Sequence, residues 1–387
     1  MATYQTVGEF TSGERLASAD LEAVRANVDL VNAQSAYPFR SLLYNGAMQV
    51  AQRGTSQASI TTTGYYTADR WQTGCTTLGT WTQSVETDAP TGYGLAKSLK
   101  MLCTTADASP AASDTVFVQQ SLEGYDVQRL AKGTASARTM VLTFWVKSNV
   151  TGTYTVLIYD NDNNRSVSKP YTVTASATWE RKEITIPADT TGAFDNDANA
   201  SLLVRWNLGL GSTFTSGTLQ TTWGTYANST VGAGQTNVAS ATNNYWQVTG
   251  VQLEAGSVST PFEFLPFGDE LRRCQRYYEK SYDVDVAPGT NTTTGLFEHY
   301  GTSDGGNITT LTINYKVTKR ATNPVVTAYT SAGVSGQWNY ARSGSSGATG
   351  VSIDRNGTGS FRVYTPSLGA AWAALYINGH WTSSSEL

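Results

Sequence analysis

The chain has 387 residues, more than one ordinary domain needs, so we expect two or three domains. Only 14% of the residues are charged, and 36 glycines separate short apolar runs, a composition typical of an all-β protein with many turns. The net charge of −4 is small, and no Lys/Arg cluster lies among the 21 tyrosines and 10 tryptophans, which argues against a nucleic-acid groove.

Residues 1–10 have neither a basic start nor an apolar core, so we expect no secretory signal. No run approaches the ~18 apolar residues of a membrane span, so we expect no membrane insertion and synthesis in the cytosol. The three cysteines, Cys75, Cys103 and Cys274, form neither an even disulfide set nor a metal-binding spacing. We predict that they are buried free thiols.

A helix is predicted to begin at Ser18, which can cap it, with Asp20 and Glu22 in its first turn. It ends before Pro38. Its apolar stripe has the spacing of coiled-coil contact positions and consists of Leu21, Val24, Val28 and Val31. Either the helix lies on its own domain or copies of it form a collar between chains. β-branched residues at both stripe positions favour an assembly larger than a dimer.

Residues 38–267 carry the first series of strand patterns. In residues 139–148, apolar side chains alternate with a mixed set that includes Trp145, which predicts a strand with one core face. Further strands are predicted at residues 116–123, 154–159, 179–186, 201–208 and 245–254. In the last of these, the apolar positions change parity, and a bulge at Gly250 explains the change.

Residues 268–282 interrupt the strand pattern with a short polar helix, so we place a domain boundary there. Residues 283–387 then form a predicted smaller sandwich, with strands at 309–318, 324–330, 359–364 and 371–377. The stretch 342–350 is rich in Ser and Gly and is predicted to be a loop. No repeat of 20 to 50 residues occurs, which argues against a solenoid or propeller.

Two Asx-rich loops are weak candidates for a hard cation, because they place side-chain oxygens at alternate positions: Asp160 and Asp162 in one, Asp195 and Asp197 in the other. Neither matches an EF-hand, since both lack the sixth-position glycine and Tyr171 stands at the twelfth position of the first. Ordinary Asx turns between strands are the simpler interpretation. We therefore predict no metal and no cofactor.

Enzymatic activity is not expected. Residues 301–305 match the sequence pattern of a nucleophile elbow, and His299 lies two residues before them. They lie, however, in a polar, all-β region and not in a strand-to-helix turn. His380 is interpreted as a surface residue or a tail contact. A glycosidase acid pair needs two carboxylates that meet in a cleft. The sequence leaves that open for Asp69, Glu86, Asp88, Glu123 and Asp126, although Asp69 is more simply an internal ion-pair partner of Arg70 or another arginine.

A sugar-binding site needs an aromatic ring that stacks on the apolar side of the sugar and polar groups around it that bind the hydroxyl groups. The aromatic residues least explained by strand alternation are the candidates: Trp145, Trp223, Tyr226, Trp338, Tyr340 and Trp381. The competing interpretation is that each is a packed core residue or an intersubunit contact.

Two regions resemble a known family. The first is Asn45-Gly-Ala-Met-Gln-Val-Ala-Gln-Arg-Gly-Thr-Ser56 followed by Tyr65-Tyr-Thr-Ala-Asp-Arg-Trp71. The second runs from Thr249-Gly-Val-Gln-Leu-Glu-Ala-Gly256 through Thr260-Pro-Phe-Glu263 into Gly268-Asp-Glu-Leu-Arg-Arg-Cys-Gln-Arg-Tyr-Tyr-Glu279. Both resemble the jelly-roll domains of bacteriophage tail and head fibres, over about residues 38–282 and more loosely beyond.

The resemblance implies a mostly β, trimeric virion protein: an N-terminal attachment segment and helix (1–37), a jelly-roll β-sandwich (38–267), a connecting segment (268–282) and a C-terminal β-sandwich (283–387) as the distal tip. It implies assembly in the bacterial cytoplasm, binding to other virion proteins through the N-terminal segment, and adhesion to a host-surface glycan. The alternatives are a capsid decoration or head-fibre protein and a stand-alone carbohydrate-binding module. Resemblance of the jelly roll to such modules is an argument from fold alone.

Overall fold

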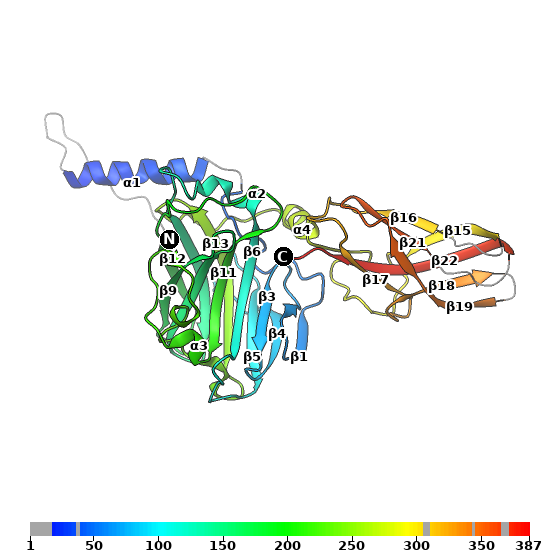
Figure 1. Cartoon of the computed structure of the whole chain (residues 1–387), viewed down its shortest axis with the longest axis horizontal. Coiled ribbons are helices and arrows are strands. Elements are labelled where there is room, and N and C mark those ends of the chain that lie inside the picture. Colours follow the sequence, from blue (N-terminus) through cyan, green and yellow to red (C-terminus); the bar gives the residue numbers. More distant parts are fainter. Residues whose placement is uncertain (1–17, 36–38, 305–309, 343–344, 365–370) are drawn as a thin grey trace.

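The computed structural model describes residues 18–35, 39–304, 310–342, 345–364 and 371–387. The molecule is elongated, with a helix, a broad β-sandwich and a narrower β body in sequence order (Figure 1). We call the part built from β1–β13 the first sandwich and the part built from β14–β22 the second sandwich.

Helix α1 (Ser18–Ser35) begins at the predicted residue and ends before Pro38, which confirms the predicted helix. Its apolar stripe does not pack on the first sandwich, because Leu21 is 53%, Val24 40% and Val28 51% exposed. The side chain of Val31 lies outside the described set. The described part of the stripe is therefore available to another molecule.

Two antiparallel sheets form the first sandwich. Sheet A has the order β1-β4-β5-β13-β7-β10 and sheet B the order β12-β9-β8-β11-β6-β3-β2. The strands are β1 (Ser56–Ile60), β2 (Gly64–Tyr65), β3 (Gln72–Thr76), β4 (Thr80–Glu86), β5 (Ser98–Thr105), β6 (Thr115–Glu123), β7 (Met140–Ser148), β8 (Gly152–Asp160), β9 (Arg165–Val173), β10 (Glu180–Ile186), β11 (Ala200–Leu210), β12 (Gly224–Thr225) and β13 (Tyr245–Ala255). Short helices α2 (Gly124–Val127) and α3 (Ser212–Thr215) lie in the connections.

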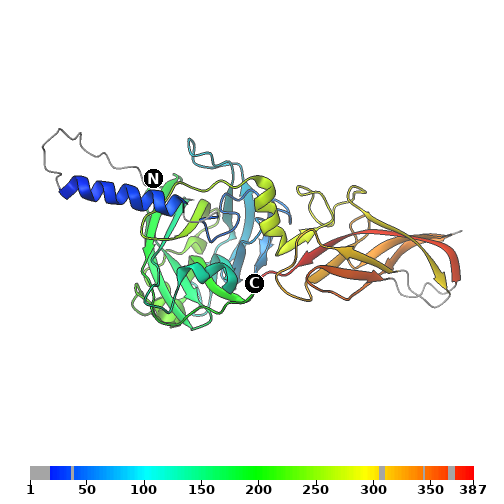
Figure 2. The ribbon, with the colours of Figure 1, turned by 90° about the horizontal axis from the view of Figure 1, so that it is seen from above.

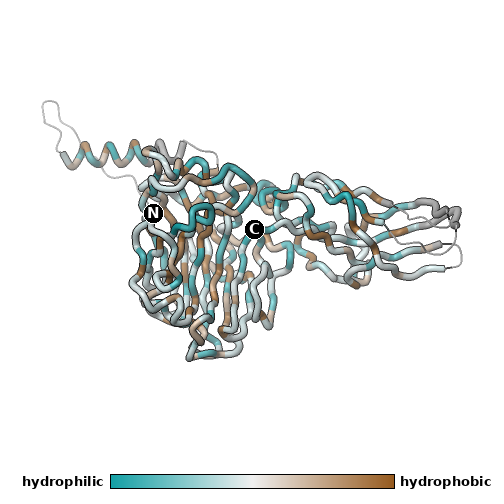
Figure 3. The backbone as a smooth tube through the Cα atoms, viewed as in Figure 1, coloured by the Kyte–Doolittle hydropathy of each residue, from teal (hydrophilic) through white to brown (hydrophobic). Residues whose placement is uncertain are grey.

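The core lies between the two sheets, where buried residues of facing strands pack together. Figure 3 shows hydrophobic residues, in brown, recurring along the strands. Trp206 from sheet B lies 5.5 Å from Trp71 and 5.7 Å from Phe144 of sheet A, measured between ring centroids. All three are fully buried. All six strands predicted in this region are present, because period-two alternation records a half-buried strand locally.

The predicted bulge in β13 is confirmed. Its pairing with β7 shifts register between Thr249 and Gln252, and Gly250 has φ +60°. A β-carbon at Gly250 would lie 2.8 Å from Leu95 Cδ1 and 3.1 Å from Trp145 Cδ1. Both the backbone conformation and the crowding therefore favour glycine at this position.

A short helix, α4 (Phe267–Gln275), joins the two sandwiches (Figure 2). The strands that follow are β14 (Tyr278–Lys280), β15 (Phe297–Asp304), β16 (Thr310–Asn314), β17 (Val325–Tyr329), β18 (Gln337–Arg342), β19 (Ser345–Gly350), β20 (Ser352–Asp354), β21 (Ser360–Tyr364) and β22 (Ala371–Ser384). One sheet is organised around β22, which pairs with β14, β15, β17 and β18, and the other has the order β16-β21-β20.

The predicted loop at 342–350 is wrong in its main part. Residues Ser345–Gly350 form β19, a hairpin partner of β18. Ser and Gly have low intrinsic strand preference, so the sequence there resembles a loop. The segment becomes a strand because its backbone forms hydrogen bonds with β18, although its side chains give no strand pattern.

The segment 385–387 returns from the second sandwich to the first. Glu386 forms ion pairs with Arg70 and with Arg53, the latter at 3.1 Å. The Arg70 side chain is fully buried and that of Glu386 is 6% exposed. Tyr65 donates a hydrogen bond to the Leu387 carbonyl at 2.7 Å. These contacts connect the two sandwiches through a buried charge cluster.

Candidate functional site

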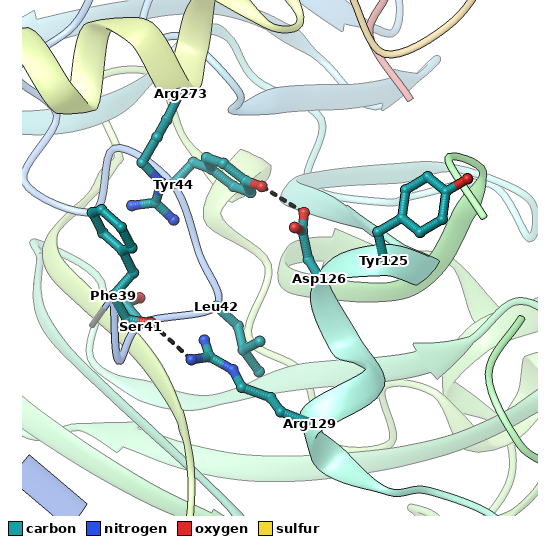
Figure 4. Close-up of a pocket in the computed structure, with 8 residues that line it drawn as sticks. All are labelled: Phe39, Ser41, Leu42, Tyr44, Tyr125, Asp126, Arg129 and Arg273. Atoms are coloured by element: carbon teal, nitrogen blue, oxygen red, sulfur yellow. Dashed lines mark hydrogen bonds between the residues drawn. The ribbon is translucent and has the colours of Figure 1, made fainter. Parts of the chain in front are cut away.

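A cavity of about 420 Å³ opens where the start of the first sandwich meets α2 and α4. Its lining residues come from three distant parts of the chain: Phe39, Ser41, Leu42, Tyr44, Tyr125, Asp126, Arg129 and Arg273 (Figure 4). We call it the junction pocket. Its volume lies within the range of about 300–1,000 Å³ that is usual for small-ligand sites.

The wall formed by residues 39–44 is held by backbone hydrogen bonds. Arg129 donates to the carbonyl groups of Phe39 at 2.7 Å and Arg40 at 3.0 Å. The Gln120 side chain accepts from the backbone N–H of Tyr44 at 2.7 Å and donates to its carbonyl at 2.9 Å. A loop with this many fixed backbone groups presents its side chains in one arrangement.

The first motif that resembles phage fibres, which begins at Asn45, packs next to this wall and holds it in place. Asn45 donates from its side chain to the carbonyl groups of Val50 at 2.7 Å and Asp69 at 3.0 Å, which ties the two halves of the motif together. Its own backbone N–H donates to Glu270 of α4 at 2.8 Å. The motif is therefore structural, and it sets the position of Tyr44 relative to α4.

The polar centre of the pocket is a pair formed by Tyr44 and Asp126. The Tyr44 hydroxyl donates to Asp126 Oδ2 at 2.5 Å. Burial, followed by the nearby Asp126 charge, raises the pKa of Tyr44, and burial raises the pKa of Asp126. The Arg273 guanidinium lies 4.3 Å from the centroid of the Tyr44 ring, a cation–π distance.

Two aromatic rings stand on opposite sides of this centre (Figure 4). Tyr125 is 55% exposed and Phe39 is 47% exposed. Large exposed rings beside a carboxylate and a guanidinium offer an apolar face together with hydrogen-bonding groups. This combination suits a ligand with one apolar face and many hydroxyl groups.

A second, smaller cavity of about 110 Å³ contains Trp145, one of the sequence-predicted residues. Trp145 lies on the outer face of sheet A, as its strand parity predicts, and is half-buried. Its ring lies 4.4 Å from that of Tyr93, and Phe264 also lines the cavity. Tyr93 therefore covers part of the Trp145 ring.

Trp223 and Tyr226 lie apart from both cavities. Trp223 is half-buried against the main core and donates from Nε1 to the Pro187 carbonyl at 2.8 Å. Tyr226 lies on the outer face of sheet B, with its ring 5.0 Å from that of Tyr159. Tyr226 packs there against a small apolar cluster of Leu157, Leu210 and Val231.

The interpretation of Trp338 and Trp381 as ligand-binding residues is wrong. Both are buried, at 0% and 1% exposed, in the core of the second sandwich. Trp338 donates from Nε1 to the His380 carbonyl at 2.9 Å, and Tyr340 is half-buried against the same core. The rings of Trp338 and Trp381 offer no open face to a sugar, because β18 and β22 direct them between the two sheets.

The surface assignment of His380 is also wrong, because its side chain is buried. Its imidazole stacks on Tyr282, with 3.8 Å between ring centroids, and Nδ1 lies 3.0 Å from the Ser281 hydroxyl. Burial lowers the pKa of His380. Strand β15 (Phe297–Asp304) includes the first four residues of the elbow-like pattern, and Gly305 lies outside the described residues.

Three of the four carboxylates named in the Asx-rich loops, those of Asp160, Asp162 and Asp197, have protein partners. Lys132 forms an ion pair with Asp160 at 2.5 Å, and Asp162 accepts from the backbone N–H of Asp195 at 2.9 Å. Asp197 accepts from the backbone N–H of Asn199 at 2.9 Å, which is an Asx turn. Within the described ranges, no group of three or more His, Cys, Asp or Glu residues is arranged to hold a metal ion.

Of the carboxylates considered for an acid pair, Glu123 and Asp126 lie near each other, because burial and, to a lesser extent, the charge of Glu123 raise the pKa of Asp126. Glu123 is bound by Arg276 at 2.6 Å and by the Tyr277 hydroxyl at 2.5 Å, and it is buried. Asp69 pairs with Arg53 at 3.6 Å, while the neighbouring Arg70 pairs with Glu386. Asp126 is the one carboxylate among the residues that line the junction pocket.

Sequence reasoning did not identify the junction pocket, because its residues are far apart in the chain. Arg273 lies in the second quoted motif and Asp126 was considered as a carboxylate, but nothing in the sequence connects them with residues 39–44. The part of the signal that existed was the neighbouring pair Tyr125 and Asp126 at the start of a short helix.

No helix in the described part of the chain is both long and apolar enough to cross a membrane.

No family model and no curated protein matches this chain. Similar solved structures include the enzymatically active domain of tailspike protein 4 from bacteriophage CBA120, at 12% identity and a TM-score of 0.31. That match covers 57% of this chain and 22% of the tailspike chain.

Carbohydrate-binding modules are also similar. The family 11 module from Clostridium thermocellum, in complex with a mixed-linked tetrasaccharide, is 10% identical, with a TM-score of 0.26 and coverage of 54% of this chain and 99% of that chain. The module TmCBM61, in complex with β-1,4-galactotriose, is 9% identical, with a TM-score of 0.28 and coverage of 56% and 99%. Since these TM-scores are low, we base a functional assignment on the residues of the pocket.

Proposed function

We propose that this chain is a structural and adhesive subunit of a bacteriophage appendage and that it binds a host-surface glycan without cleaving it. The observation that carries the proposal is the junction pocket, where two exposed aromatic rings flank the Tyr44–Asp126 pair and Arg273. Aromatic faces can stack on a pyranose ring, and the carboxylate and guanidinium can bind its hydroxyl groups.

The phage context rests on the two motifs quoted above, which resemble fibre domains over about residues 38–282. A capsid decoration protein or head fibre would use the same pocket, and so would a stand-alone carbohydrate-binding module. The three alternatives differ in what the N-terminal region attaches to.

We further propose that the bound glycan is not hydrolysed. A glycosidase holds its glycan between two carboxyl groups about 5–10 Å apart, and one of them keeps a raised pKa. In the junction pocket, burial and, to a lesser extent, the charge of Glu123 raise the pKa of Asp126. Glu123 itself is paired with Arg276, accepts a hydrogen bond from Tyr277 and does not line the pocket. Asp126 therefore has the environment of a binding residue without a catalytic partner.

Replacing Tyr125 with alanine is expected to weaken binding to purified host-surface polysaccharide by about tenfold, which corresponds to about 1.4 kcal/mol. The side chain is exposed, so the fold should remain intact. Tyr300→Ala is the matched control, because Tyr300 is 75% exposed and lies in the second sandwich. Calorimetric titration and adsorption to host cells measure the effect. Equal binding by both variants, or release of reducing ends by the wild-type protein, would contradict the proposal.

We also propose that the chain assembles as a homotrimer through α1. The exposed stripe residues Leu21, Val24 and Val28 are too few to hold an isolated coiled coil, so they must act together with a further contact between chains. We expect light scattering to give about three times the 41.5 kDa mass of one chain. Val24→Ser with Val28→Ser should weaken assembly, while Asp29→Ser on the same helix should not. A monomer at micromolar concentration would overturn this assignment.

A further inference from the structure

The outer face of sheet B carries a polar row that crosses three neighbouring strands. Gln72 of β3 pairs in register with Gln119 of β6, which pairs with Arg205 of β11. Arg205 donates from Nε to the Gln119 side chain at 2.8 Å, and Gln119 donates to the Gln72 side chain at 2.6 Å. The three side chains therefore form one continuous hydrogen-bonded row.

Aromatic side chains border this row on both sides. The Arg205 guanidinium lies 3.8 Å from the centroid of the Phe117 ring, and that ring lies over Gly74, where a β-carbon would collide with it. On the other side, the phenol groups of Tyr159 and Tyr226 interact electrostatically with Arg205. Phe117, Tyr159 and Tyr226 are all half-buried, so each keeps an exposed part.

Arg205 has no carboxylate partner, in contrast to three other arginines of the first sandwich. Arg70, Arg53 and Arg165 each have an acidic partner. Among the described residues, no Asp or Glu lies within ion-pair distance of Arg205, and its only hydrogen bond is the one from Nε to Gln119. Its two terminal nitrogens are therefore free to bind an external acceptor.

An unpaired cation in a desolvated position costs free energy, which a bound anion can offset. Burial lowers the pKa of Arg205 to about 10, so the side chain remains cationic at neutral pH. The planar guanidinium matches a carboxylate through two parallel N–H bonds. The Phe117 ring packs against this guanidinium and limits its movement.

We propose that this face binds an acidic sugar, with the terminal nitrogens of Arg205 on the ring carboxylate, Gln72 on a hydroxyl group, and Tyr226 against the apolar side of the sugar. Gln119 is buried and holds Arg205 and Gln72 in place. The ligand class is a uronic-acid-containing polysaccharide. This inference rests on the proposed glycan-binding function and assigns the chemistry of a second site, separate from the junction pocket. It also gives a role to Tyr226, which strand alternation left unexplained.

The experiment is a calorimetric titration of the full chain with tetragalacturonic acid and with its neutral counterpart, galactotetraose. We expect the wild-type protein to bind the acid at least about tenfold more tightly, with an affinity that falls as salt is raised. Arg205→Gln should abolish the preference, and Arg205→Lys should keep only part of it. Arg272→Gln, at an exposed arginine of α4, should leave the preference unchanged.

Equal affinity of the wild-type protein for both oligosaccharides would overturn the inference, as would a full preference in Arg205→Gln. Thermal unfolding of each variant checks its fold. If Arg205→Gln is unfolded, the partial loss of acid preference expected for Arg205→Lys still tests the inference. Competition by inorganic phosphate as strong as that by galacturonic acid would overturn the assignment to a sugar carboxylate. Tyr125→Ala should keep the acid preference, so loss of host adsorption in that variant reports on the junction pocket alone.

Discussion

Replacing Glu386 with alanine should lower the free energy of unfolding by about 3–5 kcal/mol, the usual cost of removing one partner of a buried ion pair. Glu386 is the carboxylate partner of Arg70, whose side chain is fully buried. Arg70 lies 3.4 Å from the centroid of the Tyr277 ring and donates to the Ser121 carbonyl at 2.6 Å, so it cannot move to solvent without breaking these contacts.

The same substitution should loosen the contact between the two sandwiches. Arg53 keeps Asp69 as a partner after the change, whereas Arg70 has no other carboxylate among the residues that the structure describes. Urea unfolding followed by tryptophan fluorescence measures the stability, and limited proteolysis around α4 measures the loosening. Asp269→Ala is the control, since its pair with Arg272 is exposed and should contribute less than about 1 kcal/mol. Similar losses in both variants would show that the buried position of Glu386 is not decisive.

Replacing Trp381 with alanine should cost about 3–5 kcal/mol through the cavity it leaves, and the loss should fall on the second sandwich. Trp381 lies 5.2 Å from Phe361, 5.9 Å from Tyr315 and 6.0 Å from Phe297, measured between ring centroids. These rings form the centre of the smaller core. Few other large residues are present there to fill the gap.

Urea unfolding should therefore show an earlier transition of the second sandwich while the first sandwich unfolds as before. Tyr300→Ala serves as the control within the same sandwich, because its ring is mostly exposed. If Trp381→Ala instead weakened glycan binding without a change in stability, the assignment of Trp381 to the core would be wrong.

The periodic parts of this fold were predictable because they are recorded locally. The alternation in residues 139–148 identified β7, its core face and the outward direction of Trp145. Capping and acidic residues identified the start of α1, and a parity change identified the bulge at Gly250. The Ser/Gly-rich β19 was missed, because its strand conformation depends on the pairing with β18.

The candidate sites were decided by the tertiary structure. Trp338 and Trp381 have the sequence surroundings of loop aromatics, yet β18 and β22 place them between sheets, since a small sandwich must bury its largest apolar residues. The junction pocket brings Phe39, Tyr125 and Arg273 together from segments that only folding makes adjacent. Composition and alternation by themselves determined an all-β chain with an N-terminal helix. Which aromatic rings stay exposed, and which arginine lacks a carboxylate, depended on how distant segments pack, because exposure and charge pairing are properties of contacts between those segments.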